Sequence, residues 1–158
     1  PGEKVRGRID WDRRYRLMRM HTAAHLLEVA VPRVVGPAPV HGSAIGLEKS
    51  RLDFRAKISS DQLPAISEEL RKLIEMDAPV RAFFCTKEEA EEVMRKYGLE
   101  LSPAYWALEK IRIVEIVGVG ADPCGGTHVS RTGEVGEVEI LRRKSKGAGI
   151  TRIEFRVI

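Results

Sequence analysis

The chain has 158 residues, of which 43% are hydrophobic and 32% are charged, a composition typical of a globular domain rather than of a disordered chain. No apolar run approaches the roughly 18 residues of a membrane span, and nothing resembles a signal peptide, so we expect no membrane partner. The net charge is +4, and basic residues are crowded near both ends of the chain. This distribution fits two interpretations equally well: a surface that binds phosphates, or two solvated faces whose charges form salt bridges.

Hydrophobic periodicity predicts both strands and helices in the first half of the chain. Strict alternation of apolar residues indicates a strand, whereas apolar residues three or four positions apart indicate a helix. Pro32 must kink or end the first helix, and Asp61 is expected to cap the second. The elements are, in chain order, a strand in residues 3–11, a helix in 13–35, a hairpin in 40–46 and 50–58, and a helix in 62–77.

The second half predicts mostly strands. Thr86 and Glu89 have the spacing of a capping box, which predicts a short surface helix that Gly98 would end. The strands are expected in residues 79–85, 111–119, 133–143 and 151–158. Strands in local hairpins with helices between them indicate a single α+β domain over residues 1–158, an antiparallel β-sheet covered by helices in a two-layer sandwich.

The two cysteines are too few for a disulfide scaffold, which favours a reducing compartment and hence a cytoplasmic protein. Cys85 lies in the apolar run "VRAFFC" and is expected to be a buried strand thiol. That leaves Cys124 as the thiol with a candidate chemical role.

Four residues in two separate motifs have the types and spacing of metal ligands. His21 and His25 are four apart in a predicted helix, so both imidazoles point the same way. Cys124 and His128 are also four apart, in "DPCGGTH". Two imidazoles from a helix and a thiolate and imidazole from a loop suit tetrahedral zinc. A histidine alone on such a face is usually a core residue, so the joint spacing carries the prediction, and a purely structural zinc remains an alternative.

Other catalytic motifs are not found. A helical metalloprotease needs a glutamate inside H-E-x-x-H, and Thr22 occupies that position. "GVGADP" begins like a dinucleotide fingerprint, but Pro123 stands where the third glycine belongs, and no phosphate loop or G-x-S-x-G elbow occurs. We therefore expect no nucleotide cofactor, and zinc acting with water is the remaining chemistry.

Four segments together resemble a known family. "DWDRRYRLMRMHTAAHLL", "GSAIGLEKSRLDF", "CGGTHVSRTGEVG" and "KSKGAGITRIEF", in this order, resemble the editing domain of alanyl-tRNA synthetase and the freestanding AlaX trans-editing proteins. The resemblance covers nearly the whole chain and implies the same fold. It also implies that His21, His25, Cys124 and His128 bind zinc and that the chain deacylates misacylated tRNA(Ala). The family removes serine and, in some members, glycine.

The sequence departs from the family pattern in two places. Longer members carry a glycine-rich, β-rich domain before the segment that corresponds to "IDW", and we expect that domain to be absent here. Where synthetases often have a glutamine two residues before Gly-Ser, this chain has Val40, followed by His41. No role of that glutamine is transferred.

The expected chemistry assigns roles to further residues. A site that demands a hydroxyl can reject alanine, since an alanyl ester would leave a buried polar group unpaired. Thr22 is a candidate partner for that hydroxyl, or else only bonds to its own helix, and Ser43 is a weaker candidate that could be simple turn chemistry. Asp53 and Asp122 are candidate orienters, although Asp53 could merely pair with a neighbouring arginine. The candidates for binding the tRNA 3′ end, unless they form only a basic turn, are Lys144, Lys146, Gly147, Gly149 and Arg152.

Two other functions remain open at this stage. One is a non-catalytic RNA-binding module in which zinc only joins helix to loop. The other is a zinc hydrolase of a small ester or amide, against which we count the lack of a clear glutamate base near the histidines. The oligomeric state cannot be inferred from the sequence.

Overall fold

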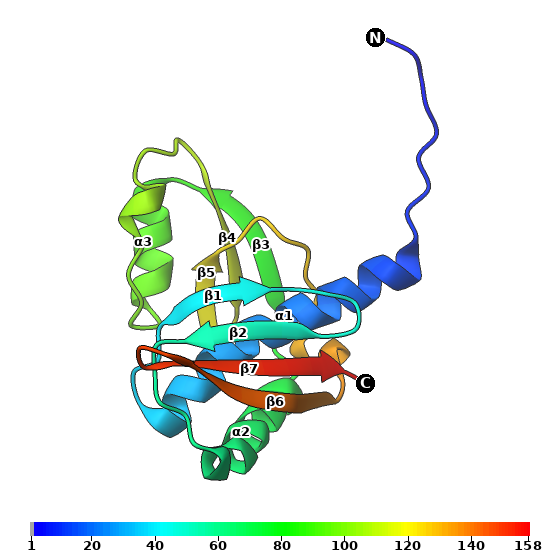
Figure 1. Ribbon diagram of the computed structural model, residues 1–158. Coiled ribbons are helices and arrows are strands. Elements are labelled where there is room, and N and C mark those ends of the chain that lie inside the picture. The colour runs from blue at the N-terminus through cyan, green and yellow to red at the C-terminus, as the bar shows by residue number, and fades with distance from the viewer. Residues whose placement is uncertain (1) are drawn as a thin grey trace.

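The computed structural model describes residues 2–158 and has an α+β fold, in which two antiparallel sheets pack with helices (Figure 1). This confirms the predicted fold class. The helices and strands are α1 (Trp11–Val35), β1 (Val40–Ala44), β2 (Ser50–Phe54), α2 (Leu63–Glu75), β3 (Val80–Cys85), α3 (Lys87–Arg95), β4 (Ile111–Ile116), β5 (Gly120–Pro123), β6 (Val138–Gly147) and β7 (Ile150–Val157).

The larger sheet has the strand order β1-β2-β7-β6, and α1 and α2 cover one of its faces (Figure 1). Alternate residues of its central strands point into the core, as a half-buried strand requires. Leu52 and Phe54 of β2 are fully buried there with Ile153 and Phe155 of β7. Met20 of α1 is fully buried in the same cluster. The helix that carries His21 and His25 is therefore packed against the larger sheet through buried apolar side chains.

The smaller sheet has the order β3-β4-β5. One face of this sheet packs against α3, where Ile111 and Ile113 join Ala90 in a second apolar cluster. Its other face turns toward α1, since a side chain added at Gly120 would lie 3.3 Å from Val29. The loop that leaves β5 thus passes close to α1, and this loop carries Cys124 and His128.

The long helix α1 follows its sequence signals at both ends. The Asp10 side chain accepts a hydrogen bond from the Arg13 backbone N–H at 3.1 Å, which caps the first turn. Pro32 lies in the last turn, and the helix ends at Val35, three residues later. Gly36 then donates its N–H to the Pro32 carbonyl at 3.0 Å. None of the helices described is both long and apolar enough to cross a membrane.

Three local predictions are wrong. Residues 2–10 form no strand, and Val5 is 88% exposed, because the structure gives this segment no partner strand and no core face to cover. The single predicted sheet is two sheets, because β4 pairs with β3 and β5 and not with β7. Asp61 does not cap α2, because it lies inside a 3₁₀ turn at Ser60–Gln62, where the Gln62 side chain accepts the Ser59 backbone N–H.

Candidate functional site

The structure brings the two predicted motifs together. His21 and His25 lie one turn apart on α1, and Cys124 and His128 reach them from the loop after β5. One ligand atom from each of these four residues lies within 4.8 Å of the others. The Cys124 Sγ is 3.5 Å from His21 Nε2 and 3.4 Å from His128 Nε2. This arrangement could hold a metal ion.

The protonation of the histidines suits a metal site. Burial, with a smaller effect of the neighbouring His21, lowers the pKa of His25 to about 4. Burial also lowers the pKa of His21, and it lowers that of His128 to about 2. All three imidazoles are therefore neutral near pH 7 and keep a free nitrogen lone pair. Burial raises the pKa of the Cys124 thiol, so an ion would have to displace its proton.

The loop between Cys124 and His128 is held close to α1. A Cβ atom at Gly126 would lie 2.1 Å from His21 Cε1, so only glycine fits beneath that ring. The Gly126 N–H donates to Cys124 Sγ at 3.4 Å. Arg112 of β4 donates from Nη1 to the carbonyl oxygens of Cys124 and Gly126, at 2.5 and 3.0 Å. Arg112 could not be identified from the sequence, because its contact with this loop depends on the pairing of β4 with β5.

Thr22 lies behind the histidines. Its side chain is fully buried, and its Oγ1 is 3.1 Å from His128 Nδ1. The same oxygen accepts the Val129 backbone N–H at 3.3 Å. If His128 Nε2 binds an ion, Nδ1 carries the proton and donates to Thr22, which fixes the ring. The structure thus places Thr22 as a support of His128, and not against the cleft where a substrate hydroxyl could reach it.

A cleft of about 790 Å³ opens beside the cluster, and His25 lines it. Its walls come from α1, β4, β5 and residues 37–40 and 98–102, and they are mostly apolar. Two carboxyl groups, those of Glu28 and Asp122, stand among these apolar residues. Asp122 is a predicted site residue, and the structure places it in the cleft.

Glu28 is a carboxyl group to which no role was assigned from the sequence. Its Oε2 is 3.8 Å from His25 Nδ1, and ligand atoms of Glu28, His25 and Asp122 lie within 4.8 Å of one another. Burial and the nearby charge of Asp122 raise the pKa of Glu28 to about 8, and burial raises that of Asp122 to about 6. The sequence offered no clear glutamate base near the histidines, whereas the structure places the Glu28 carboxyl group beside His25. Its position seven residues after His21 and three after His25 was the available signal.

The structure does not bring Asp53 to this cluster. Leu52 and Phe54 point into the core toward α1, so Asp53 points to the opposite face of the sheet. There Arg152 binds both of its oxygens, at 2.7 and 2.8 Å, and Arg51 binds one at 2.8 Å. Asp53 therefore forms an ion pair across β2 and β7, as the alternative interpretation expected, and it does not orient a group at the histidines.

The other predicted binding residues lie on the larger sheet. Ser43 is exposed on the edge strand β1, where it pairs with Leu52. Lys144, Lys146, Gly147 and Gly149 are exposed at the β6–β7 hairpin. Gly147 and Gly149 have φ values of 80° and 75°, so the turn itself explains the need for glycine. None of these residues is among the described residues that line the cleft.

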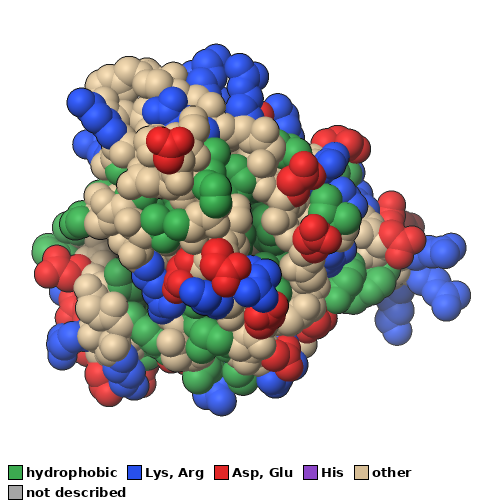
Figure 2. All heavy atoms as spheres, turned by 90° about the horizontal axis from the view of Figure 1, so that it is seen from below, with side chains coloured by type: hydrophobic (Ala, Val, Ile, Leu, Met, Phe, Trp, Pro, Cys, Tyr) green, Lys and Arg blue, Asp and Glu red, His purple; other side chains and the backbone are tan. Residues whose placement is uncertain are grey.

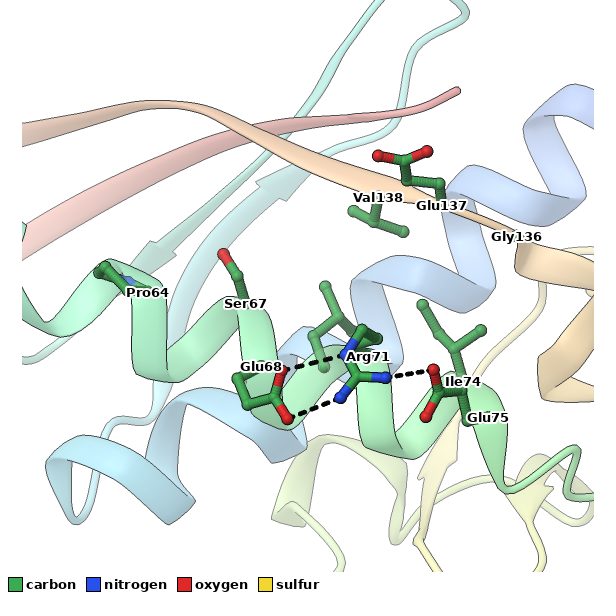
Figure 3. A pocket seen from close by; sticks show the side chains of 10 residues that line it. Pro64, Ser67, Glu68, Arg71, Ile74, Glu75, Gly136, Glu137 and Val138 are labelled. Carbon is green, nitrogen blue, oxygen red and sulfur yellow. Dashed lines mark hydrogen bonds and ion pairs between the residues drawn. The ribbon is translucent and has the colours of Figure 1, made fainter.

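A second pocket, of about 510 Å³, lies between α2 and residues 136–138 (Figure 3). Its guanidinium, that of Arg71, binds Glu68 Oε1 at 2.7 Å and also contacts Glu75, so these charges satisfy one another. On the face drawn in Figure 2, which includes α2, acidic and basic side chains alternate instead of forming one basic surface. The residues described as lining this pocket include Glu137 but no histidine or cysteine, so the His/Cys cluster remains the candidate site.

Comparisons with known proteins match the part of the chain that carries two of the four clustered residues, Cys124 and His128. Residues 111–154, which include Arg112, Cys124 and His128, match the family described as "Threonyl and Alanyl tRNA synthetase second additional domain". The chain is 37% identical to the alanyl-tRNA editing protein AlaX-M of Methanosarcina barkeri and 35% identical to that of Methanosarcina acetivorans. These matches cover 99% of this chain and 65% and 64% of the relatives. The alanine–tRNA ligase of Ignicoccus hospitalis is 39% identical over 98% of this chain and 17% of its own length. The chain thus spans just under two thirds of the AlaX-M proteins it matches.

Proposed function

Since this chain belongs to the alanyl-tRNA synthetase editing-domain family, we propose that it is a trans-editing hydrolase of misacylated tRNA(Ala). Its chief substrate is seryl-tRNA(Ala), with glycyl-tRNA(Ala) as a second candidate, and the reaction takes place in the cytoplasm without a nucleotide cofactor. The observation that carries the proposal is the cluster of His21, His25, Cys124 and His128 beside a cleft that His25 lines. Such a cleft can admit the aminoacyl group of a tRNA 3′ end.

We propose zinc as the ion of this cluster. Tetrahedral zinc with bonds of about 2.3 Å to sulfur and 2.0 Å to nitrogen separates the two ligand atoms by about 3.5 Å. The distances from Cys124 Sγ to the two Nε2 atoms, 3.5 and 3.4 Å, agree with this value. The mixed nitrogen and sulfur donor set also favours zinc over magnesium or calcium. When bound, zinc would supply a Lewis acid that polarises the ester or orients its amino acid.

The remaining steps fall to the residues of the chain. Thr22 holds the His128 ring through Nδ1, which keeps Nε2 turned toward the other ligands. Glu28 and Asp122 form a pair of carboxyl groups in an apolar cleft, and such a pair is stabilised when a cation lies beside it. The α-ammonium group of an aminoacyl ester is such a cation. We therefore assign Glu28 and Asp122 to binding this ammonium, which orients the ester at the cluster.

An aminoacyl ester is already activated, so alignment with a water molecule can supply much of the rate enhancement. Pro37, Ala38 and Leu99 give the cleft an apolar wall against which the ester could be positioned. We keep the exposed basic residues of the β6–β7 hairpin, Lys144 and Lys146, as proposed contacts for tRNA phosphates. Arg152 is already bound to Asp53 and is a weaker candidate.

A deacylation assay tests the proposal. The zinc-loaded chain is incubated with seryl-, glycyl- and alanyl-tRNA(Ala), and the release of each amino acid is compared with that in buffer. We expect seryl-tRNA(Ala) to be hydrolysed fastest and alanyl-tRNA(Ala) to be spared, with Cys124→Ala abolishing the activity. If the folded, zinc-loaded chain binds tRNA in a salt-dependent manner but hydrolyses none of the three, the RNA-binding alternative is correct.

A further inference from the structure

Arg112 on β4 lies beside the loop that carries Cys124. Its Nη1 donates hydrogen bonds to the carbonyl oxygens of Cys124 and Gly126, at 2.5 and 3.0 Å. The Arg112 backbone carbonyl also accepts the Cys124 N–H at 3.0 Å. One residue therefore makes three hydrogen bonds to the segment from Cys124 to Gly126.

This segment has few other restraints. Residues 124–130 form no helix and no strand, and two consecutive glycines lose more conformational entropy on ordering than other residues do. The Arg112 guanidinium is half-buried, and its hydrogen bonds to carbonyl oxygens are strengthened by its charge. Within the described part of the chain, Arg112 forms no ion pair with a carboxylate. Its charge is therefore available to these two carbonyl oxygens.

The segment that Arg112 holds determines two features of the geometry of the candidate metal centre. One is the position of Cys124 Sγ, which is 3.5 Å from His21 Nε2. The other is the packing of Gly126 against the His21 ring. Because ligand distances in a metal site tolerate changes of only about 0.2 Å, a small displacement of this segment affects binding.

We infer that Arg112 is a positioning residue that holds the Cys124–Gly126 segment in the conformation that binds the metal ion. It contacts neither the ion nor the substrate, and it acts through the two carbonyl oxygens. This inference rests on the metal centre of the proposed function. It differs from a general role in sheet stability, because it predicts a specific effect on metal affinity.

Replacing Arg112 with methionine tests the inference, with Arg81→Met as the matched control. Arg81 is exposed on β3 of the same sheet, where its backbone lies opposite that of Glu115 on β4. Glu115 is three residues from Arg112 along β4, so the side chains of Arg81 and Arg112 lie on opposite faces of the sheet. Zinc affinity is measured for each purified protein by competition with a chromophoric chelator. We expect Arg112→Met to bind zinc 10- to 100-fold more weakly than the control, a typical effect of losing a residue that supports metal ligands.

Two further measurements separate positioning from general stability. The thermal unfolding of the metal-free proteins should be similar for Arg112→Met and Arg81→Met, while the absorption bands of bound Co²⁺ should change only in Arg112→Met. Arg112→Lys should restore part of the affinity, since it keeps the charge but loses the planar fork.

If Arg112→Met and Arg81→Met bind zinc equally tightly, the inference is wrong even where the wild type deacylates tRNA. If Arg112→Met loses zinc affinity but the wild type hydrolyses no aminoacyl-tRNA, the inference stands and the proposed function fails. A wild-type chain that binds no zinc overturns the inference at its premise.

Discussion

Replacing Gly126 with alanine is expected to disrupt the candidate metal centre. A Cβ atom at this position would lie 2.1 Å from His21 Cε1 and 2.3 Å from His21 Nδ1. Carbon atoms in contact need about 3.5 Å, so the ring or the loop must move by about 1.4 Å. That displacement is several times the roughly 0.2 Å that metal–ligand distances tolerate. We expect zinc affinity to fall about 100-fold, at the upper end of effects seen when ligand support is lost.

The adjacent residue provides a matched control for this substitution. A Cβ atom at Gly125 would meet nothing within 4 Å, so Gly125→Ala adds the same methyl group without a clash. Zinc affinity is measured by chelator competition and seryl-tRNA(Ala) deacylation by release of serine, with circular dichroism to confirm that both variants fold. If Gly126→Ala binds zinc as tightly as Gly125→Ala, the packing of the loop against His21 does not hold the site together.

Three further predictions concern the neighbours of the metal centre. Thr22→Val leaves the Val129 N–H without its acceptor and removes the hydrogen-bond partner of His128. We expect the free energy of unfolding in urea to fall by about 1 to 3 kcal/mol and zinc to bind at least 10-fold more weakly. Unchanged zinc affinity would exclude the proposed support of His128 by Thr22. The folded-state pKa of His25 lies near 4, below its usual value, so the metal-free protein should lose up to about 3 kcal/mol from this residue as pH falls from 6.5 to 4. His25→Gln should flatten that part of the curve, and an identical pH profile would contradict the burial of a neutral imidazole. Glu28→Gln should raise KM for seryl-tRNA(Ala) about 10-fold, the equivalent of one lost ionic contact; unaltered kinetics would remove Glu28 from substrate binding.

The local elements of the fold could be predicted from the sequence, because their signals lie within a few residues of one another. The helical period of the apolar residues predicted α1, and the alternation around Leu52 and Phe54 predicted β2. The same alternation in residues 3–11 was misleading, because a strand also needs a partner and a core face. The division into two sheets depends on which distant strands pair, and no local pattern contains that information.

The residues of the candidate site also divide into those with a local signal in the sequence and those whose role depends on tertiary contacts. His21, His25, Cys124 and His128 could be predicted because each pair has a spacing of four and the donor set is chemically specific. Glu28 was predictable from its helical spacing, whereas Arg112 was not, because its hydrogen bonds follow from the pairing of β4 with β5. The position of Asp53 could have been inferred from its buried neighbours Leu52 and Phe54, which place its side chain on the outer face.

The central claim is that one zinc ion in the His/Cys cluster makes this chain a deacylase. The most direct test titrates zinc into the metal-free chain and follows the hydrolysis of seryl-tRNA(Ala) at each step. The account predicts that activity is absent without metal, rises in proportion to added zinc, reaches a plateau at one ion per chain, and is not restored in Cys124→Ala. Full activity in the metal-free chain, or an equal response of Cys124→Ala to zinc, would contradict it.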